Sequence, residues 1–385
     1  MELGIKQLSQ SAYAALQAGN NSVAKGLFEQ IIATGNADSS HWMGLAYAGS
    51  RLGDGESALK AVDKALELFP QNLRAIILKA DLLKQQGTSR KALDYYTYAL
   101  QLAANAQNIP ADIQQDLQRA EKMRAIQMDE YRSFLIQEIK ANGLSLHPGN
   151  RRFQQSLDIM LGNKEIYYQN PRRYYFPGLP QIQFYERDQF GWVGELESRT
   201  QEIQTELSAV MEDTPRFSPY VKKGDQHLGR DNKGLADNDD WSALFIWDYG
   251  HLVKENADLF PNTVDALESV PLPKITDQSP MALFSKLSAD THIPPHNGLL
   301  NTRLICHLPL IVPENCGALR VGNEMREWVE GELLVFDDSI EHEAWNRSQE
   351  ERVILLFEIW RPELNDEERQ LVTTMLQAVK AYGES

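Results

Sequence analysis

Two histidines stand 46 residues apart in settings that suit a metal centre. His296 follows two prolines, and His342 follows the segment 337–341, which is rich in acidic residues. Arg352 comes ten residues later, at the start of the apolar run 353–357. Two imidazoles and a downstream arginine are groups that can hold Fe(II) together with a dicarboxylic co-substrate. Such a site usually takes a third ligand from a His-x-Asp/Glu pair, but here that position is Gly298, which has no side chain.

Other candidate ligands lie close to this pair in the sequence. Asp337 and Asp338 are rivals for the third ligand, but we expect them to turn the end of a strand or to orient His342 by accepting a hydrogen bond. His292 and His307 belong to the same region. A single histidine there is more often a buried, hydrogen-bonded residue than a metal ligand, so these two carry less weight.

The composition is that of an ordinary globular protein, with 42% hydrophobic and 24% charged residues. The 385 residues are enough for two domains. The formal net charge of −16 argues against a nucleic-acid partner, because phosphate binding requires a basic face. No run approaches the ~20 apolar residues of a membrane span, and the first residues show no signal peptide. Two cysteines make no disulfide framework or zinc motif, so we expect reduced thiols in a cytoplasmic protein.

Small residues recur every 34 positions in the first third of the chain. Three series keep one register: Ala12, Ala46 and Ala80; Gly19, Gly53 and Gly87; and Ala24, Ala58 and Ala92. The pattern resembles the tetratricopeptide repeat, in which small residues let two antiparallel helices approach closely and glycine supports the turn between them. We expect three repeats over about residues 3–104 and a capping helix that begins after Pro110 and ends near Ala141.

Arrays of this kind usually bind a peptide segment or a partner protein in a concave groove. Recruitment of a peptide or protein is therefore the first expectation for this part of the chain. A rigid spacer or a dimerisation surface is the alternative, because a fold does not determine a function.

The pattern changes after residue 141. Turn-forming residues at 142–150 predict a linker, and the segment 171–180, rich in proline and aromatic residues, predicts an ordered but irregular stretch. The segment 192–211 predicts an amphipathic helix, with one face formed by Leu196, Ile203, Leu207 and Val210. The polar segment 222–240 is expected to be an exposed loop, with a substrate lid as the alternative.

A period of two begins near Met281 and predicts a β domain. Seven strands are expected, at 282–288, 301–312, 317–322, 325–329, 332–337, 342–346 and 351–361. The expected breaks include Pro294-Pro295. Short strands with regular turn signals indicate a sandwich or jelly roll. A final helix is expected at 366–382, with an inner face formed by Leu371, Met375, Leu376 and Val379.

Several ungapped motifs of this β region occur in the order of one known family. They are THIPPHNG at 291–298, NTRL at 301–304, GELLVFDDSIEHEAWN at 331–346, Arg352, and WRPEL at 360–364. With these motifs, the region 150–364 resembles the aspartyl/asparaginyl β-hydroxylase family, most strongly over 285–364. The resemblance implies a double-stranded β-helix, Fe(II), 2-oxoglutarate and O₂. These reactants couple the oxidative decarboxylation of 2-oxoglutarate to the hydroxylation of an unactivated carbon.

The resemblance also implies roles for individual residues. His296 and His342 would bind the iron, and Gly298 would mark the coordination position that this family leaves to water. Arg352 would pair with the distal carboxylate of 2-oxoglutarate, with Ser285 in support and His307 near the co-substrate. One departure is Ile305, where the animal enzymes have a second arginine. Arg303 is present and is a further candidate for the co-substrate site.

Together these observations predict an α + β multidomain chain. An α-helical tetratricopeptide solenoid with its cap (1–141) is followed by a linker (142–150), by a jelly-roll, cupin-like double-stranded β-helix domain with flanking helices (151–364), and by a C-terminal helix (365–385). The predicted function is hydroxylation of the β-carbon of Asp or Asn in a peptide or protein that the helical array recruits. One alternative keeps the chemistry but acts on a free amino acid, a lipid acyl chain or a natural-product intermediate. The other is a non-catalytic adaptor.

Overall fold

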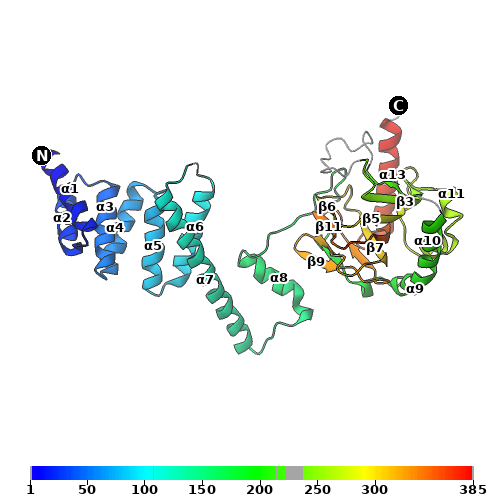
Figure 1. Cartoon of the computed structure of the whole chain (residues 1–385), viewed down its shortest axis with the longest axis horizontal. Helices are drawn as coiled ribbons and strands as arrows, with labels where there is room; N and C mark the ends of the chain where they lie inside the picture. The colour runs from blue at the N-terminus through cyan, green and yellow to red at the C-terminus, as the bar shows by residue number, and fades with distance from the viewer. Residues whose placement is uncertain (1, 107, 214–215, 222–236, 384–385) are drawn as a thin grey trace. The chain divides into compact units, whose positions relative to one another are not determined.

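The computed structural model describes residues 2–106, 108–213, 216–221 and 237–383. Its contacts divide the chain into two compact units, Met1–Leu161 and Gly162–Ser385 (Figure 1). The linker expected at 142–150 lies within the first unit. Most of the expected loop at 222–240 lies outside the described residues. No described helix combines the length and the apolar character that a membrane crossing needs.

The first unit is built of helices. Three helix pairs come first: α1 (Glu2–Gln17) with α2 (Asn21–Ala33), α3 (Ser39–Arg51) with α4 (Gly55–Leu68), and α5 (Leu73–Gln85) with α6 (Ser89–Ala104). They are followed by α7 (Ala111–Ala141), a short 3-10 helix η1 (Pro148–Asn150) and α8 (Arg151–Met160). The helical repeat domain expected from the sequence is confirmed, with one helix pair for each repeat.

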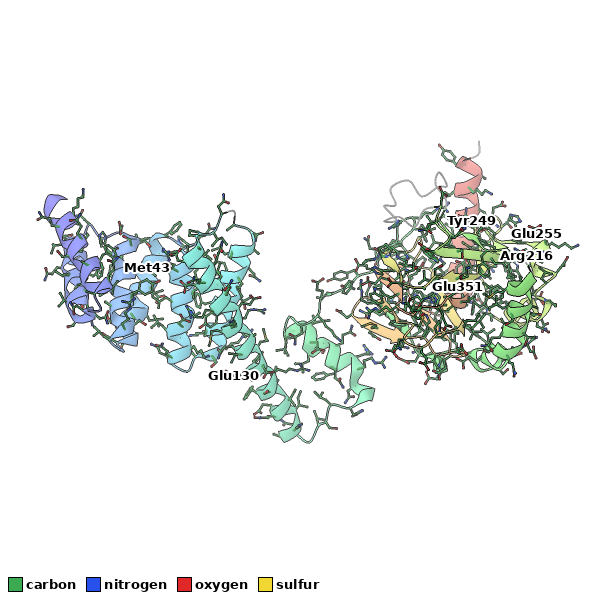
Figure 2. The ribbon with its side chains drawn as sticks, viewed as in Figure 1. Met43, Glu130, Arg216, Tyr249, Glu255 and Glu351 are labelled. Atoms are coloured by element: carbon green, nitrogen blue, oxygen red, sulfur yellow. The ribbon has the colours of Figure 1, made fainter. Side chains whose placement is uncertain are left out.

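The 34-residue series explain why these helices pair. The alanines of both series are fully buried between helices, where a larger side chain would hold the backbones apart. Gly19, Gly53 and Gly87 follow the first helix of each pair, with φ angles of 78°, 76° and 76°. Glycine adopts this left-handed conformation without steric cost, so it can end one helix and start the turn to the next. The interior is completed by larger side chains such as that of the buried Met43 (Figure 2).

The second unit contains two antiparallel sheets. The larger has the order β1-β10-β7-β12-β5-β3-β2 with β4 beside β3, and the smaller has the order β6-β11-β8-β9. The strands are β1 (Phe184–Tyr185), β2 (Ser218–Pro219), β3 (Trp241–Asp248), β4 (His251–Leu252), β5 (Ala282–Leu287), β6 (Thr291–His296), β7 (Arg303–Ile311), β8 (Ala318–Val321), β9 (Glu324–Glu327), β10 (Leu334–Phe336), β11 (His342–Asn346) and β12 (Arg352–Trp360). The helices are η2 (Arg187–Gln189), α9 (Val193–Ser198), α10 (Thr200–Asp213), α11 (Lys254–Ala257), α12 (Pro261–Glu268) and α13 (Asp366–Gly383).

From β5 onward the chain winds between the two sheets. β5, β7, β10 and β12 belong to the larger sheet, and β6, β8, β9 and β11 belong to the smaller one. This is the strand order of a double-stranded β-helix, the jelly-roll arrangement expected from the sequence. Cys306 and Cys316 are both free and buried within it.

Alternation along β12 gives the larger sheet two different faces. Val353, Leu355 and Phe357 join a hydrophobic core that also contains Leu196 of α9 and residues of α10 and α12. The residues between them turn to the opposite face, where β12 contributes Arg352, Ile354, Leu356 and Glu358 to the lining of a cavity. The outer face of the sheet, with Val353, Leu355 and Phe357, therefore stabilises the fold. The inner face, which lines the cavity, carries the polar groups Arg352 and Glu358.

The expected break at Pro294-Pro295 was wrong, because β6 runs through both prolines. β6 lies at the edge of the smaller sheet, and β11 is its neighbour. An edge strand tolerates proline because the missing N–H costs no ladder hydrogen bond on its open side.

The β domain also begins earlier than the sequence pattern suggested. β3 spans Trp241–Asp248 and pairs with β5 in the larger sheet. The amphipathic helix expected at 192–211 forms as α9 and α10, with its predicted face buried. The inner face expected for the last helix was partly wrong, since Leu371 is 63% exposed and Val379 is 51% exposed. Leu376 of the expected face is buried, and it packs with Val372 against Ile275.

A close contact within the helical unit generates a prediction. A Cβ atom added to Gly44 of α3 would overlap the ring of Phe28, whereas a Cβ on Gly26 of α2 would meet no atom within 4 Å. Gly44→Ala should therefore lower the free energy of unfolding by about 1–3 kcal/mol through overpacking. Gly26→Ala, the matched control, should raise it by about 0.5–1 kcal/mol because alanine favours the helix. Chemical denaturation followed by circular dichroism measures both; equal stability of the two variants would contradict this packing.

Candidate active site

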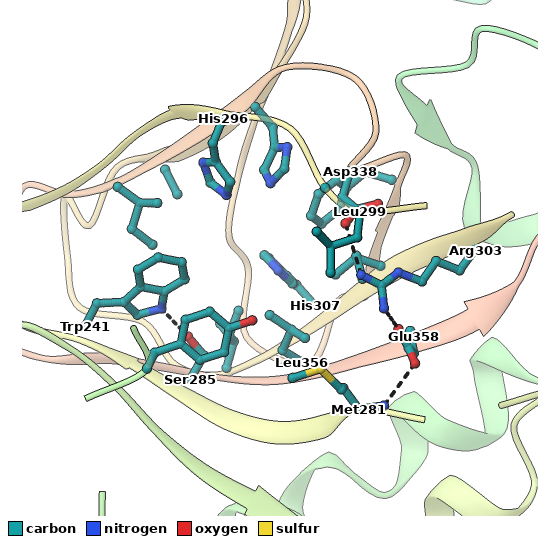
Figure 3. A pocket seen from close by; sticks show the side chains of 18 of the residues that line it. Trp241, Met281, Ser285, His296, Leu299, Arg303, His307, Asp338, Leu356 and Glu358 are labelled. Atoms are coloured by element: carbon teal, nitrogen blue, oxygen red, sulfur yellow. Dashed lines mark hydrogen bonds and ion pairs between the residues drawn. The ribbon is translucent and has the colours of Figure 1, made fainter. Parts of the chain in front are cut away.

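A cavity of about 220 Å³ lies against the inner faces of both sheets. Figure 3 shows His296 on one side of it, Trp241 and Ser285 on a second side, and Arg303, Asp338 and Glu358 on a third. All the residues predicted from the sequence to form the site line this cavity: His296, His342, Gly298, Arg352, Ser285, His307 and Arg303. The fold thus brings together residues that are spread over β5, β6, β7, β11, β12 and the loops beside them.

The two histidines are direct neighbours across the smaller sheet. His342, the first residue of β11, is paired with His296, the last residue of β6. Their ring centroids are 4.1 Å apart. His296 Nδ1 lies 2.8 Å from the carbonyl of Pro294, and His342 Nδ1 lies 3.0 Å from the carbonyl of Ile340. A hydrogen bond of this kind fixes the ring, so Nε2 is the nitrogen that each histidine can offer to a metal.

An irregularity in β6 directs His296 into the cavity. The register shifts between His342, which pairs with His296, and Ala344, which pairs with Ile293. One residue on β11, Glu343, therefore lies opposite two on β6, Pro294 and Pro295. In a regular strand Ile293 and His296 would face opposite sides. With the bulge both line the cavity.

Gly298 provides space for a neighbouring carboxylate. Its N–H donates a hydrogen bond to the carbonyl of Asp338 at 2.6 Å, and a Cβ at position 298 would overlap the Asp338 side chain. Gly298 does not have a positive φ angle. The reason for glycine here is therefore space rather than backbone conformation.

Asp337, one of the two expected rivals for the third ligand position, is engaged in hydrogen bonds within the protein. Asp337 is fully buried and accepts hydrogen bonds from Arg361 Nη1 at 2.7 Å and from the Ser339 backbone at 3.0 Å. These contacts fit the expectation that an acidic residue turns the end of the strand.

Within the described part of the chain, no three His, Cys, Asp or Glu side chains are placed so that they could hold a metal together. His296 and His342 are thus the candidate ligands, and the other coordination positions would belong to small molecules.

Arg352 is buried and has no carboxylate partner among the described residues. Its side chain is 1% exposed, lies 4.6 Å over the ring of Trp328, and leaves Nε and Nη1 without hydrogen-bond partners. Burial lowers the pKa of Arg352 to about 10, so the side chain is still charged at neutral pH. Buried, unpaired donors on a positive charge are suited to a ligand carboxylate.

Two further polar groups face the same part of the cavity. Ser285 Oγ accepts a hydrogen bond from Trp241 Nε1 at 3.2 Å, which leaves the hydroxyl hydrogen for another acceptor. His307 is buried, and burial together with the charge of Arg352 holds its pKa well below the usual value. The ring is therefore neutral at pH 7, and its Nδ1 has no protein partner. These residues fit a bound dicarboxylate.

Arg303 reaches the cavity, but carboxylates hold its guanidinium. One terminal nitrogen forms an ion pair with Glu358, and the other lies 3.7 Å from Asp338 (Figure 3). Ile305 faces the same cavity and is paired in register with Glu358. The position at which the resemblance implies a second arginine is thus an apolar part of the wall.

The sequence analysis did not include several residues that line the cavity. Trp241 and Phe245 come from β3, and Tyr220 precedes the segment outside the described residues. The aromatic and β-branched content of 241–247 was a usable signal for this strand. Glu358 was also missed, although a single acid within the apolar run 353–360 signals a buried charge that needs a partner.

Comparison with known proteins gives matches for both parts of the chain. Residues 197–362 match the family described as Aspartyl/Asparaginyl beta-hydroxylase. The chain is 33% identical to the ornithine lipid ester-linked acyl 2-hydroxylase of Rhizobium tropici over 183 residues, which are 46% of this chain and 60% of that protein. It is also 33% identical to human aspartyl/asparaginyl beta-hydroxylase over 140 residues, which are 36% of this chain and 18% of that protein. The Yersinia enterocolitica type III secretion translocator chaperone SycD aligns at 19% identity and a TM-score of 0.32, covering 34% of this chain and 88% of the chaperone.

The packing of Gly298 leads to a prediction. Gly298→Ala should lower the melting temperature of the metal-free protein, because the new methyl group overlaps Asp338 and overpacking costs about 1–3 kcal/mol. Adding Asp338→Ala should recover most of that loss, because the obstructing carboxylate is gone. Differential scanning calorimetry of both single variants and the double variant measures this coupling. Additive effects would mean that the two side chains do not compete for space.

Proposed function

We propose that the chain is an Fe(II)- and 2-oxoglutarate-dependent oxygenase, because residues 197–362 match the aspartyl/asparaginyl β-hydroxylase family. The proposed reaction is hydroxylation of the β-carbon of Asp or Asn in a peptide or protein. The observation that carries the proposal is the pairing of His296 with His342 in one cavity with a buried, unpaired Arg352. A metal ligand pair and an anion site in one cavity fit a metal-bound dicarboxylate.

His296 and His342 would hold the iron through Nε2. Their Nδ1 atoms hydrogen-bond to backbone carbonyls, which orients both rings and favours the tautomer that a metal requires. Gly298 has no side chain that could bind the iron, so water would fill the position that a carboxylate usually takes.

Arg352 would bind the distal carboxylate of 2-oxoglutarate. The planar guanidinium donates two parallel hydrogen bonds, which fixes the direction of a dicarboxylate as well as its position. Ser285 would donate to the same carboxylate, and the neutral His307 would offer a hydrogen bond nearby. Arg303 is held by Glu358 and Asp338, so we propose that it contributes to the wall of the cavity rather than to the distal carboxylate site.

Iron, 2-oxoglutarate and O₂ supply the oxidising power that removes a hydrogen atom from an unactivated carbon and returns a hydroxyl group. The chain contributes orientation and the exclusion of water. Trp241, Ile354 and Leu356 line the cavity beside the polar groups and keep much of it apolar.

The helical unit would recruit the peptide or protein. Three helix pairs with a continuous small-residue core form an array of the kind that binds extended segments. We propose that this unit raises the local concentration of substrate near the cavity and takes no part in the chemistry.

A second candidate keeps the chemistry but changes the substrate. The Rhizobium relative is named for hydroxylation of an ester-linked acyl chain. That name favours a lipid acyl chain over a free amino acid or a natural-product intermediate among the alternative substrates. The non-catalytic adaptor is disfavoured by Arg352, because a buried charge without a partner is costly unless a ligand uses it.

The first test loads the protein with Fe(II) and 2-oxoglutarate under argon and then admits air. We expect a weak visible charge-transfer band under argon and release of succinate in air. His296→Ala and His342→Ala should each abolish both signals without changing the helical circular dichroism of the first unit. His292→Ala, an exposed residue of the same strand that hydrogen-bonds to Glu343, is the matched control and should keep both. Absence of the band and of succinate in metal-loaded wild-type protein would refute the oxygenase.

The second test concerns Arg352. Arg352→Met should weaken 2-oxoglutarate binding at least ~30-fold, because the ligand carboxylate loses a buried charged partner, a loss on the order of 2–5 kcal/mol. The same change should raise the melting temperature of ligand-free protein, since burial disfavours the charged side chain in the folded state. Isothermal titration calorimetry under argon and thermal unfolding measure the two effects. The exposed Arg347, changed to Met, is the control; unaltered 2-oxoglutarate affinity in Arg352→Met would contradict the assignment.

A further inference from the structure

An irregular segment lies against both loops that border the metal-binding histidines. We call this segment, residues 167–181, the strap. The backbone N–H of Arg172 donates a hydrogen bond to the carbonyl of Gly298 at 3.0 Å, and that of Asn170 donates to the carbonyl of Ser339 at 2.8 Å. Gly298 belongs to the loop after β6, and Ser339 belongs to the loop before β11. The strap thus contacts both loops at once, although it precedes the region that matches the family.

One buried amide of the strap joins the same two loops through its side chain. Gln169 is 6% exposed. Its Oε1 accepts a hydrogen bond from Asn301 Nδ2 at 2.9 Å, and its Nε2 donates to Asp337 Oδ2 at 2.7 Å and to the carbonyl of Pro180 at 3.0 Å. Asn301 lies in the loop after β6, and Asp337 lies in the loop before β11. Because the amide uses its oxygen and both of its hydrogens, the orientation of Gln169 is determined.

A buried ion pair forms the centre of this connection. Arg361 and Asp337 are both fully buried, and Arg361 Nη1 lies 2.7 Å from Asp337 Oδ2. The same nitrogen donates to the carbonyl of Asn301 at 3.2 Å. Asp337 Oδ1 accepts a hydrogen bond from the Ser339 backbone at 3.0 Å, which shapes the turn before β11. The charge of Arg361 compensates the buried carboxylate, and Gln169 supplies one of the additional hydrogen bonds that such a pair needs.

The position of the two loops determines how the histidine rings are held. His342 Nδ1 lies 3.0 Å from the carbonyl of Ile340, a residue of the loop before β11. His296 is followed by Asn297, whose Nδ2 donates to the carbonyl of Ser339 in the same loop at 2.9 Å. Displacement of either loop would therefore shift a metal ligand, and the geometry of a metal site depends on such outer contacts.

We infer that Gln169 is a positioning residue for the metal pair, because it holds both loops in place through Asn301 and Asp337. The inference rests on the proposed function, since it concerns the metal that His296 and His342 would bind. It extends the metal site to the strap, so that residues before the family match contribute to metal binding.

Gln169→Met in the full chain tests the bridge between the loops. Methionine has a similar shape but lacks the amide donor and the strong acceptor. In the metal-free protein, we expect amide hydrogen exchange in the loops 297–302 and 337–341 to become about tenfold faster, because both lose a buried contact. Mass spectrometry of proteolytic peptides measures the exchange. Unchanged exchange, or faster exchange in only one of the two loops, would contradict the bridge.

Titration with Co(II), a spectroscopic substitute for Fe(II), measures metal affinity in the same variant without turnover. Loss of the visible absorption of bound Co(II) in His296→Ala would show that the titration reports on the metal pair. We expect Gln169→Met to weaken Co(II) binding about tenfold, the lower end of the loss when an outer contact of a metal ligand is removed. Faster exchange of both loops with unchanged Co(II) affinity would overturn the inference.

Asn346→Leu is the matched control for a loss of stability alone. Asn346 is also a buried amide, 1% exposed, and its Nδ2 donates to three backbone carbonyls. It lies at the opposite end of β11 from His342. We expect this variant to lose at least as much melting temperature as Gln169→Met but to keep the Co(II) affinity of the wild type. Equal weakening of Co(II) binding in both variants would mean that Gln169 acts only through overall stability, which refutes the positioning role.

The same measurements separate the inference from the proposed function. A wild-type protein that binds no Co(II) would overturn the metal pair of His296 and His342, and the inference with it. A wild-type protein that binds Co(II) but releases no succinate with Fe(II) and 2-oxoglutarate in air would refute the oxygenase. In that case weaker Co(II) binding by Gln169→Met alone would still support the positioning role.

Discussion

The antiparallel register between β6 and β11 is the constraint on which the site depends. It sets His296 opposite His342 at the end of the smaller sheet. β6 is an edge strand, so its neighbour β11 determines its register. A slip by one residue would turn His296 out of the cavity, because side chains alternate between the faces of a strand. The bulge at Pro294-Pro295 places Ile293 and His296, which are three residues apart, on the same side of the strand, so that both side chains line the cavity.

The two arginines on the inner face of the larger sheet, Arg303 and Arg352, differ in their carboxylate partners. Arg303 is neutralised by Glu358 and Asp338, whereas Arg352 has an aromatic ring over it and no carboxylate partner in the part of the chain that the structure describes. Burying an uncompensated charge costs stability. The outer face of the same strand offsets this cost, because Val353, Leu355 and Phe357 are fully buried in the main core. Side chains of β12 alternate between the two faces of the sheet. One face of the strand thus stabilises the fold, while the other holds the buried cation of Arg352.

Prediction from sequence succeeded where the determining contacts are local. The turns after Gly19, Gly53 and Gly87 depend on the glycines themselves, so the helix pairs could be predicted from spacing. The course of β6 could not, because proline at an edge is acceptable only once the sheet order is known. The face of α13 was ambiguous for a similar reason: two overlapping apolar stripes exist, and contact with Ile275 selects the one with Val372 and Leu376. The candidate site residues were found through motifs, but Glu358 and its pairing with Arg303 required the register of β7 and β12.

Asp338 connects the two halves of the proposed site. Its carboxylate occupies the space that a side chain at position 298 would need, and it also lies 3.7 Å from Arg303. A carboxylate at position 298 would displace Asp338, and Arg303 would then lose one of its two acidic neighbours. The glycine at position 298 and the acidic surroundings of Arg303 therefore have one structural origin, which is the space that the Asp338 side chain fills.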